Sequence, residues 1–257
     1  GSNTALYSAI LSNNKLSDLR LLYKALPDST EERHFGGSIL VTQEFVFFTI
    51  GDRGNRDVNP QSVSLDGGKV YRLNLDGSIP DSNPFYNVDS SKKAIWSYGH
   101  RNPQGIIKVT RNVGVNDYEI WIHEHGPRGG DEINIIKAGK NYGWPLASYG
   151  VNYIGTKFTD KTTINGMEDP IHYWVPSIAP TELVQLPVAG WGTWGRALVL
   201  GTLREEVLVF MKVNEKLEVT ESVRVDMGDR IRDLEVLSNG SLLATTDSGK
   251  LITVSNS

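Results

Sequence analysis

A lone histidine in a glycine-rich segment is the first candidate for acid–base chemistry. It stands in Arg33-His34-Phe35-Gly36-Gly37, shortly before an apolar stretch. An imidazole has an unperturbed pKa of about 6.5, so His34 could serve as a general base at neutral pH. The alternative is a structural histidine that hydrogen-bonds a neighbouring carbonyl, and the residues alone leave both interpretations open.

A second polar segment covers residues 99–105 and combines a cation with two amides. Arg101, Asn102 and Gln104 alternate there with proline and glycine, which restrict the backbone. Arginine forms charge-assisted hydrogen bonds with carboxylates, so the segment predicts a clamp for an anionic, oxygen-rich ligand. The alternative is a polar connection whose side chains cap loose backbone groups.

Two adjacent carboxylates, Asp131 and Glu132, follow the glycine- and proline-rich residues 125–130. Carboxylate and turn-carbonyl oxygens are ligands that Ca²⁺ prefers, which indicates a calcium site here. The spacing is not that of an EF-hand, because the alternating ligands and the closing glutamate are absent. A solvated acidic turn is the alternative.

Two arginines near the C-terminus, Arg230 and Arg232, are spaced to share one face of a strand. Two neighbouring guanidinium groups repel each other unless an anion joins them. That anion could be Asp229 or Asp233 from the same segment, or a bound polycarboxylate.

The elements that position these residues are predicted to be short β-strands. Apolar runs at residues 45–50, 118–122, 197–200 and 241–246 each end in a turn. Alternating strands followed by polar turns recur at residues 70–79 and 208–217, and again at residues 6–16. Only residues 19–26 carry a weak helical periodicity. The pattern predicts an all-β chain, a β-propeller of four-stranded blades, with a β-sandwich as the alternative.

Composition excludes several classes of protein. The 257 residues carry 26 basic and 30 acidic side chains, a formal charge of −4, which argues against a nucleic-acid binder. Zero cysteines exclude thiol catalysis and thiolate metal sites. No apolar run approaches the roughly 20 residues of a membrane span. We expect one propeller domain over residues 1–257, with Gly1-Ser2 left by cloning.

Long motifs give the chain a family resemblance from about Ala5 to the C-terminus. They are His34-Phe35-Gly36-Gly37, Thr49-Ile50-Gly51-Asp52, residues 68–80, residues 99–105, Gly126-Pro127, Asp131-Glu132-Ile133-Asn134, Asn141-Tyr142-Gly143-Trp144-Pro145 and Arg230-Ile231-Arg232-Asp233. In this order they resemble the soluble aldose (glucose/sorbosone) dehydrogenases that depend on pyrroloquinoline quinone (PQQ). The resemblance implies a six-bladed propeller that binds PQQ and calcium.

The resemblance also assigns roles to individual residues. His34 matches the catalytic base. The residues that match cofactor-binding positions are Arg101, Asn102, Gln104, Tyr153, Arg204, Arg230 and Arg232. The carbonyls of Gly126 and Pro127 match ligands of the calcium ion that holds the quinone. Glu132 and the Tyr142 carbonyl match a further calcium site of some members.

Two departures from the family pattern stand out. Arg204 takes the place of a lysine, which keeps the charge but changes the geometry. The family also carries roughly one further blade upstream of the segment that opens this chain, so we expect an incomplete propeller that lacks an N-terminal blade.

The resemblance implies an enzyme that oxidises the anomeric carbon of an aldose to a lactone and passes electrons to an external acceptor. It also implies a periplasmic or secreted protein. Two alternatives remain: a calcium-dependent lactonase, and a calcium-binding propeller without catalysis. The lactonase would not need the arginine pair.

Overall fold

The computed structural model describes residues 1–110 and 118–255, and it confirms the predicted all-β class. Within these residues the chain forms β-strands and a single 3₁₀ turn, η1 (Gly192–Trp194). No helix in the described part is long and apolar enough to cross a membrane. The chain divides into two compact units, each of which is described by itself. The first comprises Gly1–Pro103, Lys137–Ala147 and Thr163–Glu168, and the second comprises Gln104–Ile136, Ser148–Thr162 and Asp169–Ser257.

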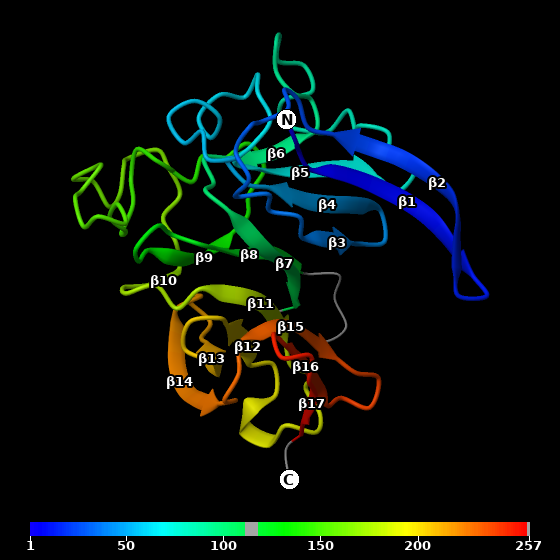
Figure 1. Ribbon diagram of the computed structural model, residues 1–257, viewed down its shortest axis with the longest axis vertical. Coiled ribbons are helices and arrows are strands. Elements are labelled where there is room, and N and C mark those ends of the chain that lie inside the picture. The colour runs from blue at the N-terminus through cyan, green and yellow to red at the C-terminus, as the bar shows by residue number, and fades with distance from the viewer. Residues whose placement is uncertain (111–117, 256–257) are drawn as a thin grey trace. The chain divides into compact units, whose positions relative to one another are not determined.

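The first unit contains a hairpin and a four-stranded antiparallel sheet (Figure 1). The hairpin consists of β1 (Ala5–Ser12) and β2 (Lys15–Lys24). The sheet runs in chain order through β3 (Ile39–Val41), β4 (Phe45–Ile50), β5 (Lys69–Asn74) and β6 (Ile95–Tyr98). Neighbours along the chain are therefore neighbours in the sheet, as in a propeller blade.

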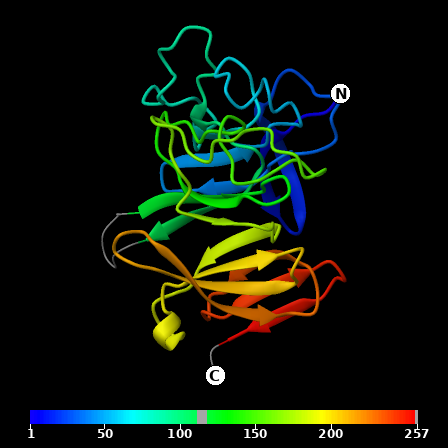
Figure 2. The ribbon, with the colours of Figure 1, turned by 90° about the vertical axis from the view of Figure 1, so that its left-hand side faces the viewer.

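The second unit contains three antiparallel sheets that also follow chain order. The first is formed by β7 (Pro103–Thr110), β8 (Tyr118–Glu124), β9 (Asp131–Ile135) and β10 (His172–Trp174). The second is formed by β11 (Pro180–Gln185), β12 (Leu198–Thr202), β13 (Val207–Val213) and β14 (Val219–Asp226). The third has three strands, β15 (Ile231–Val236), β16 (Leu242–Thr246) and β17 (Leu251–Val254). Figure 2 shows the second and third sheets side by side, and their facing side chains share one apolar cluster.

The strand predictions are confirmed, whereas the helical periodicity at residues 19–26 was misleading. The apolar and alternating runs lie on β4, β5, β8, β12, β13 and β16. Residues 19–24 belong to β2, because this segment pairs with β1 through the turn at Asn13 and Asn14. Tertiary pairing overrides a weak local periodicity here.

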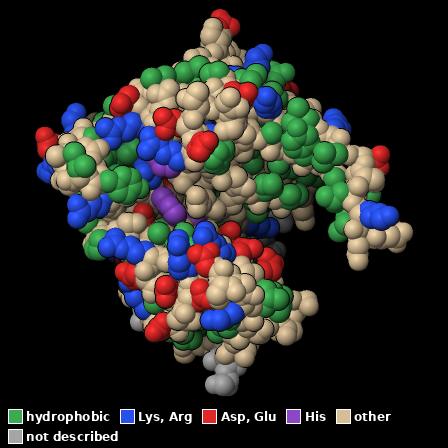
Figure 3. All heavy atoms as spheres, viewed as in Figure 1, with side chains coloured by type: hydrophobic (Ala, Val, Ile, Leu, Met, Phe, Trp, Pro, Cys, Tyr) green, Lys and Arg blue, Asp and Glu red, His purple; other side chains and the backbone are tan. Residues whose placement is uncertain are grey.

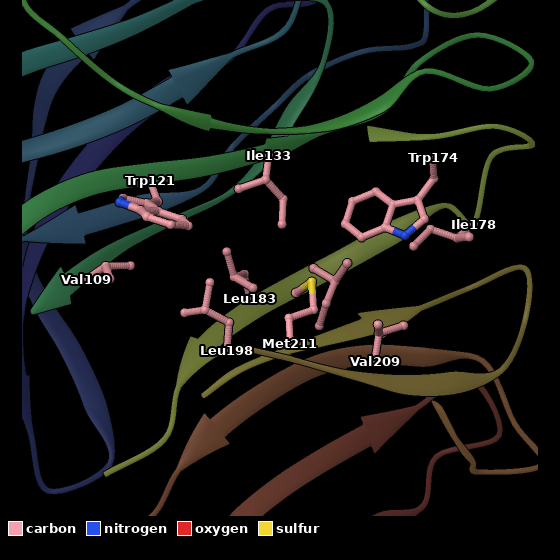
Figure 4. Close-up of a cluster of buried hydrophobic side chains, with 10 residues drawn as sticks. Val109, Trp121, Ile133, Trp174, Ile178, Leu183, Leu198, Val209 and Met211 are labelled. Carbon is pink, nitrogen blue, oxygen red and sulfur yellow. The ribbon is translucent and has the colours of Figure 1, made fainter. Parts of the chain in front are cut away.

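The interior of each unit is built from side chains on the faces of the sheets. In the first unit Phe48 of β4 and Tyr71 of β5 stack with ring centroids 4.9 Å apart, and Tyr23 of β2 packs against both. In the second unit Trp121 and Met211 are fully buried within the cluster between its first two sheets (Figure 4). Buried strands with packing on both faces leave the connecting loops as the places for polar chemistry.

The β1–β2 hairpin is the exception, because much of its apolar surface is exposed. Figure 3 shows hydrophobic side chains along this projecting arm. Tyr7, Ile10 and Leu11 of β1 are 50%, 57% and 70% exposed. Only the base of the hairpin is packed, where the Tyr23 hydroxyl donates a hydrogen bond of 2.6 Å to Asp66.

Candidate active site

Three loops of the first unit meet at one end of the β3–β6 sheet. Antiparallel pairing brings the entry of β3, the exit of β4 and the exit of β6 to the same end. The backbone N–H of Asp52 donates to the Arg101 carbonyl at 2.7 Å, and that of Gly37 donates to the Thr49 carbonyl at 3.0 Å. The predicted segments around residues 34 and 101 are therefore brought together.

His34 and Asp52 form a hydrogen-bonded imidazole–carboxylate pair in this loop cluster. His34 Nδ1 lies 2.6 Å from Asp52 Oδ1, and the side chains are 17% and 1% exposed. The carboxylate also accepts hydrogen bonds of 2.8 Å from the Gly54 N–H and from Trp144 Nε1. Three donors thus hold Asp52, and Asp52 in turn orients the ring. With its proton on Nδ1, the imidazole keeps a basic Nε2.

Gly51 permits the close approach of the loops around this pair. A Cβ atom at this position would clash with the His34 carbonyl and would lie 2.7 Å from Asn102 Oδ1. Asn102 Oδ1 accepts a hydrogen bond of 3.2 Å from the Gly36 N–H. The Asn102 amide therefore ties the histidine loop to the segment that follows β6.

The other predicted residues of the first unit are Arg101 and Tyr142, and both are buried. The Arg101 guanidinium lies over the Trp144 ring, 5.4 Å from its centroid. The Tyr142 ring stacks on His100 at 4.6 Å, and its hydroxyl accepts a hydrogen bond of 2.9 Å from the Lys137 N–H. Its carbonyl stays a predicted calcium ligand.

In the second unit, Asp131 organises the loop that carries Gly126 and Pro127. Asp131 is fully buried, and its Oδ1 accepts a hydrogen bond of 2.8 Å from the Gly126 N–H. Its Oδ2 accepts from the Ser177 hydroxyl at 2.6 Å and from the backbone N–H groups of Ile178 and Ala179, at 2.8 and 2.9 Å. Both carboxylate oxygens are thus used by the chain's own donors, so Asp131 holds loops in place.

Glu132 faces a second carboxylate. Its partner across the β8–β9 ladder is the buried Glu124, and the Asn134 amide donates to both carboxylates at 3.3 Å. Burial, followed by the charge of Glu124, raises the pKa of Glu132 well above its usual value. Asn134 Oδ1 is buried without a hydrogen-bond partner. Two opposed carboxylates beside an unused amide oxygen suit a cation, although the described residues contain no cluster of three or more acidic or histidine side chains placed to hold a metal.

Arg230 and Arg232 lie together as predicted, but the carboxylate between them belongs to Asp247. Arg230 Nε lies 3.2 Å from Asp247 Oδ2, and Arg232 Nε contacts Asp247 Oδ1. Asp229 is instead held by the Ser248 and Thr246 hydroxyls, which lower its pKa to about 2. Neither Asp229 nor Asp233 therefore joins the arginines. The pairing acid comes from the turn after β16, which antiparallel pairing places beside the start of β15.

The remaining predicted residues of the second unit are more accessible. Tyr153 is 68% exposed, and Gln104 is partly buried on β7. Arg204 is exposed and donates from Nη1 to the Ser177 carbonyl at 3.0 Å, which connects it to the loop that Asp131 holds.

Sequence reasoning missed the roles of Asp52 and Trp144. Asp52 ends the motif Thr49-Ile50-Gly51-Asp52, and an acidic residue directly after a buried strand is a usable signal. Trp144 is 92 residues away from Asp52, so only the fold reveals their hydrogen bond.

Comparison with known proteins identifies the family. The family model described as Glucose / Sorbosone dehydrogenase matches residues 1–253. The chain belongs to this family. Among curated glucose/sorbosone dehydrogenase relatives, the chain is 39% identical over 251 residues to aldose sugar dehydrogenase YliI of Escherichia coli strain K12. That alignment covers 94% of this chain and 65% of the relative. Quinoprotein glucose dehydrogenase B of Acinetobacter calcoaceticus is 36% identical over 147 residues, covering 50% of this chain and 29% of that protein.

The solved structures confirm the propeller class of this member of the glucose/sorbosone dehydrogenase family. The soluble aldose sugar dehydrogenase from Escherichia coli in its apo form superposes with a TM-score of 0.91 at 37% identity. The superposition covers 98% of this chain and 74% of that structure. The chain thus spans 65% of the curated aldose sugar dehydrogenase and 74% of the solved one, and the number of blades stays a prediction.

Proposed function

We propose that the chain carries the catalytic base of a PQQ-dependent aldose dehydrogenase, which oxidises the anomeric carbon of an aldose to a lactone. The observation that carries the proposal is the buried Asp52 carboxylate bound to the His34 imidazole, within the motif of the family. The names of relatives point the same way, since one is an aldose sugar dehydrogenase and another is a quinoprotein. An external electron acceptor and a periplasmic or secreted location belong to the same proposal.

His34 removes the proton of the anomeric hydroxyl through Nε2. As the O–H bond breaks, C1 gives up its hydride and the C1–O bond becomes the lactone carbonyl. When bound, PQQ supplies the two-electron acceptor for that hydride, with calcium as a Lewis acid. Asp52 stabilises the imidazolium ion that forms, and the bonds from Gly54 and Trp144 keep its carboxylate in place.

The residues predicted to bind PQQ suit a small ligand with three carboxylates. Arg230 and Arg232 share one carboxylate, so the group keeps a net positive charge, and both side chains are about half exposed. A guanidinium has five N–H donors, more than the shared Asp247 can engage. Arg204 adds a further cation, while Arg101, Asn102, Gln104 and Tyr153 stay predicted contacts.

The residues predicted to bind calcium fit a hard cation. The Gly126 and Pro127 carbonyls belong to a loop that Asp131 holds by hydrogen bonds. Glu132 faces Glu124 in a buried site, where a divalent cation would relieve the repulsion between the two carboxylates.

Reconstitution tests the proposal. Metal-free protein is titrated with PQQ and calcium, and aldose-dependent dye reduction is then measured. We expect turnover only when PQQ, calcium and aldose are all present. Lactone hydrolysis without PQQ binding would establish the lactonase instead, and calcium binding with no PQQ affinity would establish a non-catalytic module.

A further inference from the structure

Arg53, the residue after Asp52, is buried against the loop that carries His34. The residue is 1% exposed. Its Nη1 donates to the Arg33 carbonyl at 3.0 Å, and its Nη2 donates to the Glu31 carbonyl at 2.7 Å. One guanidinium thus binds two carbonyls of the segment that leads into the histidine.

Arg53 also contacts His34 and the residue after it, Phe35. The Arg53 N–H donates to the His34 carbonyl at 3.4 Å. The Arg53 guanidinium lies 3.5 Å from the centroid of the Phe35 ring, a cation–π contact. Arg53 therefore touches Arg33, His34 and Phe35, three consecutive residues.

The backbone of His34 needs such support. His34 has a backbone φ of +54°, in the left-handed region that residues other than glycine seldom adopt. Between Lys24 and Ile39, all of them described residues, the chain forms no strand. Ser29 makes an isolated bridge with Ser2, and Gly37 bonds Thr49, so the backbone pairing lies on either side of His34. A strained residue at a functional position persists only when its surroundings determine its conformation.

We propose that Arg53 is a positioning residue that fixes the backbone of His34, so that the ring meets Asp52. Two consecutive residues then fix His34: Asp52 hydrogen-bonds its imidazole, and Arg53 hydrogen-bonds its backbone carbonyl. The inference deepens the proposed function and rests on it for its catalytic meaning, but the geometry of the pair can be tested without quinone or sugar.

The tautomer of His34 separates positioning from other roles of Arg53. The hydrogen bond to Asp52 keeps the imidazole proton on Nδ1, so loss of positioning would let a mixture of the Nδ1–H and Nε2–H tautomers form. Loss of the cationic field alone, or a purely structural role that only reduces stability, would leave the proton on Nδ1 in the folded protein.

The experiment is ¹⁵N NMR of the full chain labelled with ¹⁵N-histidine, without cofactor, in mildly alkaline solution. The His34 signal is assigned by its absence in His34→Gln. We expect Arg53→Gln to convert the single Nδ1–H tautomer of His34 into a mixture, seen as movement of its Nδ1 and Nε2 signals toward each other. Arg53→Lys keeps the charge but cannot bind both backbone carbonyls as the guanidinium does, so we expect the same change. The matched control is Arg56→Gln in the same loop, since Arg56 pairs with Asp57 at 3.5 Å in a partly exposed position.

A wild-type tautomer of His34 in the folded Arg53→Lys variant would overturn the proposal, and this variant decides the matter if Arg53→Gln does not fold. In the reconstituted enzyme we expect kcat to fall about tenfold in Arg53→Lys with KM unchanged. If the wild-type chain shows no turnover while the variants change the His34 tautomer, the proposed function fails and the positioning role of Arg53 stands.

Discussion

At the scale of single residues, the site depends on buried polar groups whose partners are far away in the chain. His34 was identifiable as a candidate base because it stands in a glycine-rich segment before a strand and because that segment matches the family motif. Asp52, which hydrogen-bonds the imidazole, and Trp144, which hydrogen-bonds Asp52, follow from the fold. A hydrogen bond over 92 residues leaves no local pattern in a single sequence.

Lys69 is a second buried polar residue near the loop that carries Asp52. Lys69 is fully buried, and its ammonium group donates hydrogen bonds to the carbonyls of Gly67, at 2.6 Å, and of Asn59. Asn59 Nδ2 in turn donates to the Asp52 carbonyl at 3.0 Å. Burial lowers the pKa of Lys69 to about 7, against the opposing effect of Asp66 and Asp52.

This pKa predicts a specific dependence of stability on pH. Between about pH 7 and pH 10 the unfolded chain keeps the Lys69 proton while the folded protein releases it, so the free energy of unfolding rises with pH. Lys69→Met lacks this contribution. We expect the difference in free energy of unfolding, wild type minus variant, to grow by about 2 kcal/mol between pH 7 and pH 9. Urea unfolding at both pH values measures it, and parallel curves would show that Lys69 stays charged in the folded protein.

At the scale of elements, the strands were predictable and the loop contacts were not. Apolar and alternating runs bounded by turn residues identified β4, β5, β8, β12, β13 and β16. Register and loop pairing depend on tertiary contacts, which is why Asp247 was missed as the partner of Arg230 and Arg232. The role of Asp131 also depends on tertiary contacts. Its position beside Glu132 suggested a metal ligand, yet its carboxylate oxygens accept hydrogen bonds from backbone N–H groups of two loops.

Asp131→Asn should destabilise the second unit. An amide keeps one acceptor oxygen, loses the charge, and turns an N–H₂ group toward at least one backbone donor. We expect a loss of about 2 kcal/mol in the free energy of unfolding, measured by urea denaturation. Asp160→Asn is the matched control, because this aspartate is exposed and pairs with Lys157 at 3.4 Å. A loss no larger than that of the control would refute the role given to Asp131.

At the scale of the whole molecule, the resemblance described the family correctly and the propeller class with it. Long motifs in a fixed order over nearly the whole chain carry that information, and residues 1–253 match the family model.

Features outside the motifs were less predictable. The exposed apolar residues of β1 belong to an uncharged strand, whereas β2 carries four charged side chains. An uncharged exposed edge is a place where another strand can pair.

The central claim is that His34 is the base for sugar oxidation, and one comparison tests it most directly. Wild type and His34→Gln are loaded with PQQ and calcium, and aldose-dependent dye reduction is measured beside PQQ affinity in the same samples. The account predicts an unchanged affinity for PQQ and a turnover rate at least about 100-fold lower in the variant. A folded His34→Gln protein that oxidises the sugar at the wild-type rate would contradict it.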